Sequence, residues 1–277
     1  MRFRKSARLD STQVSDRRGM GGPALIGGGG VVGLIFLVIT LLSGGNPLGG
    51  TEGINLGEEG ANLTAECKTG SDANQRQDCR IVGVINSVQA FWEQELPDYT
   101  KAQTVFFTQG VSTGCGNASS AVGPFYCPLD RNIYIDLGFY DDLRTRFGAR
   151  GGPFAEAYVI AHEYGHHVQN ILGTLERGQD GTTGPSSSAV RVELMADCFA
   201  GMWAKGAVDT GFIEELTDAD ISDGLDAAAA VGDDRIQEKV QGRVDPESWT
   251  HGSAKARQQW FRHGFESTTV RECDTFD

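Results

Sequence analysis

The residues best suited to chemistry lie in one stretch, His162-Glu163-Tyr164-Gly165-His166, which matches the pattern HExxH. On an α-helix, side chains at positions i and i+4 lie on one face about 6 Å apart, so both imidazoles can bind one tetrahedral Zn²⁺. Glu163 would lie beside the metal, where its carboxylate can take a proton from a bound water whose pKa has fallen to about 7. The pattern therefore predicts a zinc hydrolase.

The sequence around the motif predicts the helix that this geometry needs. Between residues 154 and 172 apolar residues recur at roughly helical spacing, and Gly173 can cap the C-terminal end. Short patterns also arise by chance, and two helical histidines can simply be hydrogen-bonded in a core or on a surface. The helical context favours the metal site.

A zinc hydrolase of this kind needs a third protein ligand. The metzincin pattern HExxHxxGxxH fails, because its glycine and third histidine would fall at Gln169 and Leu172. Farther along, Glu193 and Asp197 stand at i and i+4 in a second helical segment, for which the serines at 186–188 suit an N-cap. This arrangement resembles the ExxxD motif of gluzincins, in which the glutamate, here Glu193, completes the zinc site.

In the gluzincin arrangement the aspartate, here Asp197, accepts the other ring N–H of a ligand histidine and fixes its tautomer. The alternative is a solvated acidic helix face, but apolar residues surround the two acids. They are Val192, Leu194, Met195, Ala196, Phe199, Ala200, Met202 and Trp203. We therefore expect one Zn²⁺ per chain, held by His162, His166 and Glu193.

Seven stretches of the sequence resemble one bacterial protein family. They are DRRG (16–19), TGCGNASSAVGPFYCPLDRNIYIDL (113–137), AHEYGHHVQN (161–170), ELMADCFAG (193–201), GDDRIQ (232–237), THGSAKARQQWFRHGF (250–265) and CDTF (273–276). On these motifs the chain is similar to the neutral zinc metallopeptidases, membrane-anchored proteins of zincin type. The resemblance spans nearly the whole chain and implies a zincin-like fold with a retained anchor.

The N-terminal region predicts a membrane segment. Residues 1–23 carry six basic and two acidic residues, and residues 24–42 carry no charge. We expect a basic cytoplasmic tail, one transmembrane helix and a catalytic domain on the extracytoplasmic side. Secretion after signal cleavage is the alternative, because the strongly apolar core at 31–42 is short and residues 43–45 are small. The glycines at 27–30 also weaken the span.

The cysteines support export independently. All six follow the apolar segment, and an even number suits disulfides in an oxidising compartment. Six cysteines allow 15 pairings. The expected pairs are the short loops Cys67–Cys79 and Cys115–Cys127, which leaves Cys198 for Cys273.

Charge limits the partners of the exported part. Without residues 1–23, 18 of the 24 Lys and Arg and 35 of the 37 Asp and Glu remain. This acidic surface would repel nucleic acid, whereas peptide or protein substrates in the cell envelope remain plausible.

The rest of the chain predicts one α+β domain. The Gly-rich residues 43–62 read as a linker, and residues 63–277 are enough for one core. A helix at 81–96, a strand at 104–108 and a strand at 132–137 precede the active-site helix. In zincin-like folds, which the chain resembles, the strand shortly before the active-site helix lines the cleft, so residues 132–137 are the candidate for that sheet edge, where an extended substrate could add as a strand. The alternative is an ordinary buried strand.

One distant histidine is a further catalytic candidate. His251 precedes a predicted helix at 253–265 and could donate a hydrogen bond to the oxyanion of the transition state, oriented by Asp233 or Asp234. Gluzincins often use a distant histidine in this way, and the alternative is a structural role at the helix N-terminus. His167 points about 100° away from its neighbour His166, so we expect it to pack or to face solvent.

Together these features predict a zinc-dependent endopeptidase in which Glu163 is the general base. Two alternatives remain open from the sequence. The domain could be an envelope scaffold or binding module with little turnover, or it could hydrolyse a non-peptide amide of the cell wall.

Overall fold

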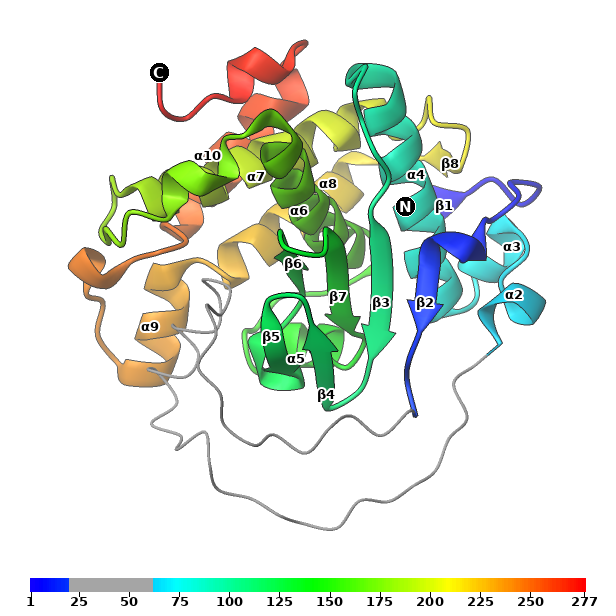
Figure 1. Cartoon of the computed structure of the whole chain (residues 1–277), viewed down its shortest axis with the longest axis horizontal. Coiled ribbons are helices and arrows are strands. Elements are labelled where there is room, and N and C mark those ends of the chain that lie inside the picture. Colours follow the sequence, from blue (N-terminus) through cyan, green and yellow to red (C-terminus); the bar gives the residue numbers. More distant parts are fainter. Residues whose placement is uncertain (20–61) are drawn as a thin grey trace.

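The computed structural model describes residues 1–19 and 62–277. They form a mixed α+β unit around a four-stranded sheet (Figure 1), which confirms the α+β part of the predicted fold class. The strands are β1 (Arg2–Phe3), β2 (Val14–Asp16), β3 (Gln103–Phe107), β4 (Gly110–Thr113), β5 (Gly116–Ser119), β6 (Phe125–Cys127), β7 (Asn132–Asp136) and β8 (Ile213–Glu215). The helices are α2 (Leu63–Glu66), α3 (Gly70–Ala73), α4 (Gln77–Glu95), α5 (Phe139–Thr145), α6 (Pro153–Leu172), α7 (Ser188–Gly206), α8 (Asp218–Ala230), α9 (Asp233–Gln241) and α10 (Ala254–Glu266).

The main sheet has the strand order β2-β3-β7-β6. The first three strands are parallel, and β6 is antiparallel to β7. Alternate residues of the strands point to opposite faces, so Phe106 and Ile135 join the helical core while Val105 and Tyr134 join a smaller cluster under the β4–β5 hairpin. The sheet is therefore covered by helices on one face and by the hairpin on the other.

The strand predicted as the cleft edge is internal. β7 pairs with β3 on one side and with β6 on the other, so the prediction of an edge at residues 132–137 is wrong. The chain reverses between the two strands through a turn in which the Arg131 N–H donates to the Cys127 carbonyl over 2.8 Å, with Arg131 at a φ of 58°. This turn folds β6 back onto β7, and β6 becomes the edge.

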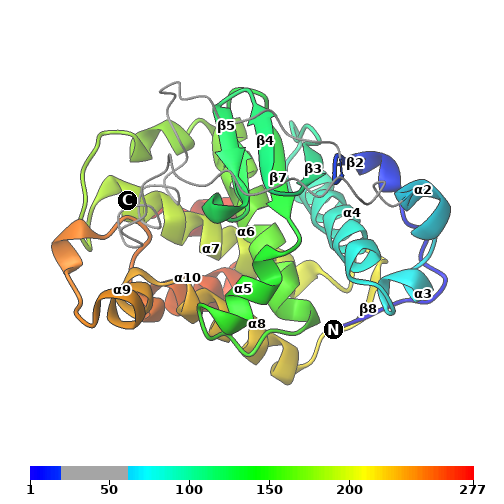
Figure 2. The same ribbon diagram turned by 90° about the horizontal axis from the view of Figure 1, so that it is seen from below.

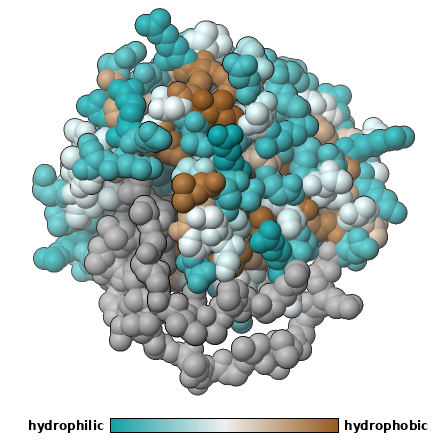
Figure 3. Space-filling model, viewed as in Figure 1, coloured by the Kyte–Doolittle hydropathy of each residue, from teal (hydrophilic) through white to brown (hydrophobic). Residues whose placement is uncertain are grey.

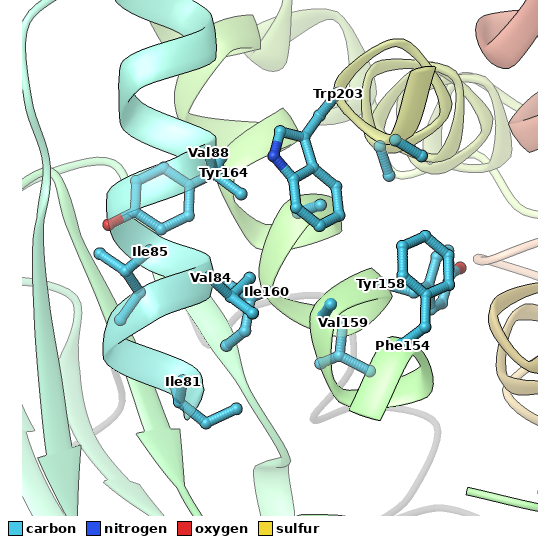
Figure 4. Close-up of a cluster of buried hydrophobic side chains, with 14 of the residues drawn as sticks. Ile81, Val84, Ile85, Val88, Phe154, Tyr158, Val159, Ile160, Tyr164 and Trp203 are labelled. Carbon is cyan, nitrogen blue, oxygen red and sulfur yellow. The ribbon is translucent and has the colours of Figure 1, made fainter. Parts of the chain in front are cut away.

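Helix packing forms the centre of the molecule. Side chains of α4, among them Val84 and Val88, point toward Ile160 and Tyr164 of α6 (Figure 4). α6 also packs against α7 and α8, and α10 lies along α7 (Figure 2). The two helices that carry the HExxH and ExxxD motifs are thus neighbours in the core.

The three disulfides of the structure are the three expected pairs. They join Cys67 to Cys79, Cys115 to Cys127 and Cys198 to Cys273. The first joins the end of α2 to α4, the second joins the β4–β5 turn to β6, and the third joins α7 to the C-terminal segment. Each disulfide therefore fixes a peripheral segment to the core.

Residues 1–19, expected to form a tail, are instead part of the fold. β1 pairs antiparallel with β8, and β2 pairs in parallel with β3. The predicted transmembrane helix at 24–42 and the predicted linker up to residue 61 lie outside the described residues. In residues 1–19 and 62–277, no helix combines the length and the apolar character needed to cross a membrane.

The face seen in Figure 3 is mostly hydrophilic, and its apolar side chains form small separate patches. This pattern is ordinary for a folded domain, since scattered surface apolar residues are common.

Candidate metal centre and catalytic site

The structure brings the three predicted zinc ligands together. His162 and His166 of α6 face Glu193 of α7, and one ligand atom from each residue lies within 4.8 Å of the others. The His162 Nε2 is 3.1 Å from Glu193 Oε2, and the His166 Nε2 is 3.4 Å from Glu193 Oε1. All three side chains are buried.

Asp197 orients the first of these histidines. Its Oδ1 lies 2.9 Å from the His162 Nδ1, where it accepts the ring N–H. The proton is thereby held on Nδ1, and the lone pair on Nε2 is directed toward Glu193. This is the geometry that the ExxxD motif implies.

Gln169 orients the second histidine. From the sequence this residue stands out only as a mismatch to the metzincin pattern. Its Oε1 lies 2.8 Å from the His166 Nδ1, and its Nε2 donates to the Val192 carbonyl over 2.6 Å. The side chain is fully buried, so both bonds are shielded from water. Its position three residues after His166, on the same helix face, was the available sequence signal.

These bonds allow a test of whether the residues fit a metal ion. With both Nδ1 atoms donating, two imidazole lone pairs and one carboxylate converge on the same buried space. Neutral imidazoles and a carboxylate in this space repel one another unless a proton or a cation lies between them, and two imidazole nitrogens with one carboxylate oxygen are a preferred donor set of catalytic Zn²⁺. The residues therefore fit zinc.

A close helix contact makes this convergence possible. A Cβ atom on Gly165 would lie 2.9 Å from the Ala196 carbonyl oxygen and 3.0 Å from the Ala196 Cα. Because this residue is a glycine, α6 and α7 can approach each other closely next to the proposed zinc ligands. The N-cap of α7 is the side chain of Ser187, which accepts from the Val190 N–H.

Arg257 of α10 joins the site through Asp197 and had no signal in the sequence analysis. Its Nε donates to Asp197 Oδ2 over 2.8 Å, and its Nη2 donates to Oδ1 over 3.1 Å. The Tyr158 hydroxyl, 2.5 Å from Oδ1, also donates to this carboxylate. Burial opposes ionisation of Asp197, but the charges of Arg257 and His162 and their hydrogen bonds hold its pKa below the usual range.

Glu163 lies at the same site but is not tied to the ligands. Its side chain is 2% exposed, and its Oε2 has no hydrogen-bond partner among the described residues. Burial raises the pKa of this carboxyl above its usual value. A buried carboxylate with one oxygen unpaired is a group ready to exchange a proton with a molecule that enters the site.

His251 lines the same cavity as His162 and Glu163. Its Nδ1 donates to Asp233 Oδ1 over 3.2 Å, and its Nε2 is buried with no partner among the described residues. Asp233 also accepts three backbone N–H bonds from residues 250–252, whereas Asp234 accepts from the Ala254 N–H at the start of α10. Of the two aspartates considered from the sequence, Asp233 is therefore the one that orients His251.

The cavity beside these residues has a volume of about 60 Å³ and mostly apolar walls. Its polar lining consists of His162, Glu163, His251, Arg257 and the Tyr158 ring. The other lining residues are Gly123, Pro124, Phe139, Phe147, Val159, Val231 and Ile236. The candidate reacting groups thus face a pocket that excludes bulk water on several sides.

The other histidines near the motif do not join the ligands. His167 is buried and makes ring-nitrogen hydrogen bonds to the Tyr126 hydroxyl and the Thr100 carbonyl, so it packs on the opposite side of α6. His263 is exposed and bonds to the Glu272 carbonyl. Both have structural partners outside the candidate site.

A second group of metal-type side chains, Cys67, Asp78 and Cys79, also lies close together. Its two sulfur atoms are joined in a disulfide, so neither is a thiolate that could bind a metal. The histidine-carboxylate group is the stronger candidate centre.

Comparisons with known proteins find similar bacterial proteins. A relative from Mycobacterium tuberculosis, uncharacterized protein Rv2575, is 54% identical over 219 residues, covering 76% of this chain and 75% of the relative. Uncharacterized protein YpfJ of Escherichia coli K12 is 37% identical over 301 aligned positions, covering 99% of both chains. No solved structure matches the chain at a significant level.

The family comparison covers the chain almost end to end. Residues 1–276 match the family described as "Putative neutral zinc metallopeptidase". This range includes His162, His166 and Glu193, together with the N-terminal strands. The chain belongs to this neutral zinc metallopeptidase family.

Proposed function

We propose that the protein is a zinc-dependent endopeptidase that holds one Zn²⁺ per chain through His162, His166 and Glu193. The observation that carries this proposal is the buried convergence of two oriented imidazoles and a carboxylate beside Glu163. Family membership supports zinc and hydrolysis at the level of the family description.

Glu163 is the proposed proton carrier. When bound, Zn²⁺ would supply Lewis acidity, which polarises a peptide carbonyl and makes a water molecule acidic near neutral pH. Glu163 takes a proton from the attacking water at its free Oε2 and gives it to the amine nitrogen as the peptide C–N bond breaks. The raised pKa of Glu163 suits a group that must both accept and release a proton.

His251 is the proposed donor to the carbonyl oxygen on which negative charge grows. Its Nε2 has no hydrogen-bond partner in the part of the chain that the structure describes, and Asp233 holds the other ring nitrogen as a donor. When the ring is protonated, Nε2 carries a proton that can be given to the oxyanion as a hydrogen bond. One oriented donor of this kind contributes about 2.7–4 kcal/mol to the transition state.

The cavity walls indicate a substrate preference. Phe139, Phe147, Val159 and Ile236 offer an apolar surface in the cavity that Glu163 also lines. We infer that a bulky apolar side chain next to the scissile bond binds there, since burying such a side chain contributes about 1.5–3 kcal/mol. The substrate is then a peptide or protein segment with such a residue.

The disulfides support a location outside the cytoplasm. Three disulfides in a domain of this size are typical of oxidising compartments, such as the periplasm or the cell surface. We therefore propose that the enzyme acts on peptides of the cell envelope.

The test uses the purified full chain with a diverse peptide library and with cell-wall peptide fragments that contain non-peptide amides. Cleavage of library peptides that is lost on chelation and restored by Zn²⁺ supports the endopeptidase. Zinc-dependent release from cell-wall fragments alone favours the amide hydrolase. No turnover by a folded, zinc-loaded chain contradicts the proposal and favours the scaffold.

A further inference from the structure

The DRRG motif and the 15 residues before it take no part in the candidate site, yet they are bound tightly to the domain. Three consecutive residues of β2, from Val14 to Asp16, pair with β3, and the Arg17 N–H donates to the Phe106 carbonyl over 2.8 Å. We propose that residues 1–19 are an integral part of the metallopeptidase domain and lie on the same side of the membrane as residues 62–277.

Two asparagine clamps support this proposal, one from the buried Asn86 and one from the exposed Asn74. The Asn86 side chain accepts from the Asp10 N–H over 2.8 Å and donates to the Asp10 carbonyl over 3.0 Å. Asn74 makes the same pair of bonds to Phe3, over 2.9 and 3.0 Å. In each clamp one amide side chain forms hydrogen bonds with both the N–H and the carbonyl of one backbone residue. A tail that only rests on the surface would not need such paired bonds.

An aromatic contact fits the N-terminal segment to α4. Phe3 is 1% exposed, and a Cβ atom on Gly83 would lie 2.6 Å from its Cε1 atom. Glycine is unfavourable in the middle of a helix, and Gly83 stands well inside α4. The Phe3 ring explains why position 83 is glycine, because any larger side chain there would displace the ring.

The DRRG motif adds an ion-pair cluster at the start of α4. Arg18 donates to Asp16 over 2.6 and 2.9 Å and also reaches Asp78, which Arg76 contacts over 2.8 Å. The Arg18 guanidinium lies 5.4 Å from the centre of the Phe106 ring. The motif thus connects β2, β3 and α4 at one point, beside the Cys67–Cys79 disulfide.

These contacts conflict with a single membrane crossing. One crossing by residues 24–42 would place residues 1–19 and 62–277 on opposite sides of a hydrocarbon layer about 30 Å thick. The hydrogen bonds between β2 and β3 cannot form across that distance. If the two segments pair in the working protein, both must lie on one side of the membrane.

The inference is independent of the proposed reaction and compartment. It requires only that both segments share a side, whether that side is the cytoplasm or the envelope. Its failure and the failure of the endopeptidase proposal can therefore be distinguished.

The experiment compares two variants of the full chain in intact bacterial cells, each with one cysteine added to the six native ones, and the unsubstituted chain is the control for labelling of the native cysteines. Ser6→Cys reports the N-terminal segment, and the matched Ser186→Cys reports the domain, since both serines are exposed. Each is treated with a membrane-impermeant maleimide before and after permeabilisation. We expect the two variants to react alike, both before permeabilisation if the domain is exported and both only after it if the domain is cytoplasmic. Reaction of only one of them in intact cells overturns the inference.

Hydrogen exchange of the purified full chain provides a second measurement. The amides of Phe3, Arg4 and Arg17 donate to the Asn74 side chain, the Phe212 carbonyl and the Phe106 carbonyl, and they should exchange far more slowly than in an unfolded chain. The amide of the exposed residue Lys5 has no acceptor within residues 1–19 and 62–277 and is the internal control for fast exchange. Exchange of all four at the rate of an unfolded peptide overturns the inference.

Discussion

Replacing Gln169 by methionine tests the orientation of the zinc ligands. Methionine has a similar length but cannot accept the His166 N–H or donate to the Val192 carbonyl. The His166 ring would then be free to rotate or to change tautomer, and loss of such a partner typically weakens metal binding about 10–100-fold. By the relation between affinity and free energy, this corresponds to about 1.4–2.8 kcal/mol.

The same substitution removes two buried hydrogen bonds from the zinc-free protein. At about 1 kcal/mol for each bond, the free energy of unfolding should fall by about 2 kcal/mol. The zinc affinity is measured by competition with a chelating dye, and the stability by urea unfolding of the metal-free chain.

Asn170→Ala is the matched control on the same helix. Asn170 donates to the Tyr126 hydroxyl over 2.8 Å and touches no proposed ligand, so this variant should lose stability but not zinc affinity. The reasoning is refuted if Gln169→Met binds zinc as tightly as the wild type, or if both variants lose affinity equally.

Three further outcomes are expected. The pKa of His251 lies above its usual value of about 6.5 because the hydrogen bond and charge of Asp233 outweigh the lowering effect of burial. kcat/KM should therefore fall as pH rises through this pKa, and in Asp233→Asn a pH profile should show that alkaline fall at lower pH. Arg257→Met leaves the buried Asp197 without its cationic partner, so urea unfolding of the zinc-free chain should show a loss of about 3–5 kcal/mol. Phe147→Ala should lower kcat/KM about tenfold or more for peptides with a large apolar residue at the scissile bond, and less for peptides with alanine there.

The geometry within each helix could be predicted from sequence because the helical repeat fixes which side chains share a face. His162 and His166 on one helix, and Glu193 and Asp197 on the next, needed only that repeat and the apolar residues around them. Gln169 follows the same rule but was missed, because an amide beside a ligand carries no pattern of its own.

Contacts between distant segments could not be predicted. Arg257 lies 60 residues after Asp197, and nothing in its local sequence shows that α10 packs along α7. Residues 1–19 looked like a tail because their charge dominates their composition, whereas their folding depends on clamps supplied by α3 and α4. β6 has three residues, too few to show the alternating pattern that predicts a strand. The sequence therefore gives no sign of a strand outside β7 at this side of the sheet.

The measurement that tests the central claim most directly is the kcat/KM of the full chain and of Glu163→Gln, on the best peptide from the library and at equal zinc content. The substitution keeps the shape of the side chain but removes its ability to take a proton. We predict that Glu163→Gln binds zinc like the wild type and cleaves about 10²–10⁴-fold more slowly. Equal cleavage by the two proteins would contradict the assignment of Glu163, and with it the proposed peptidase mechanism.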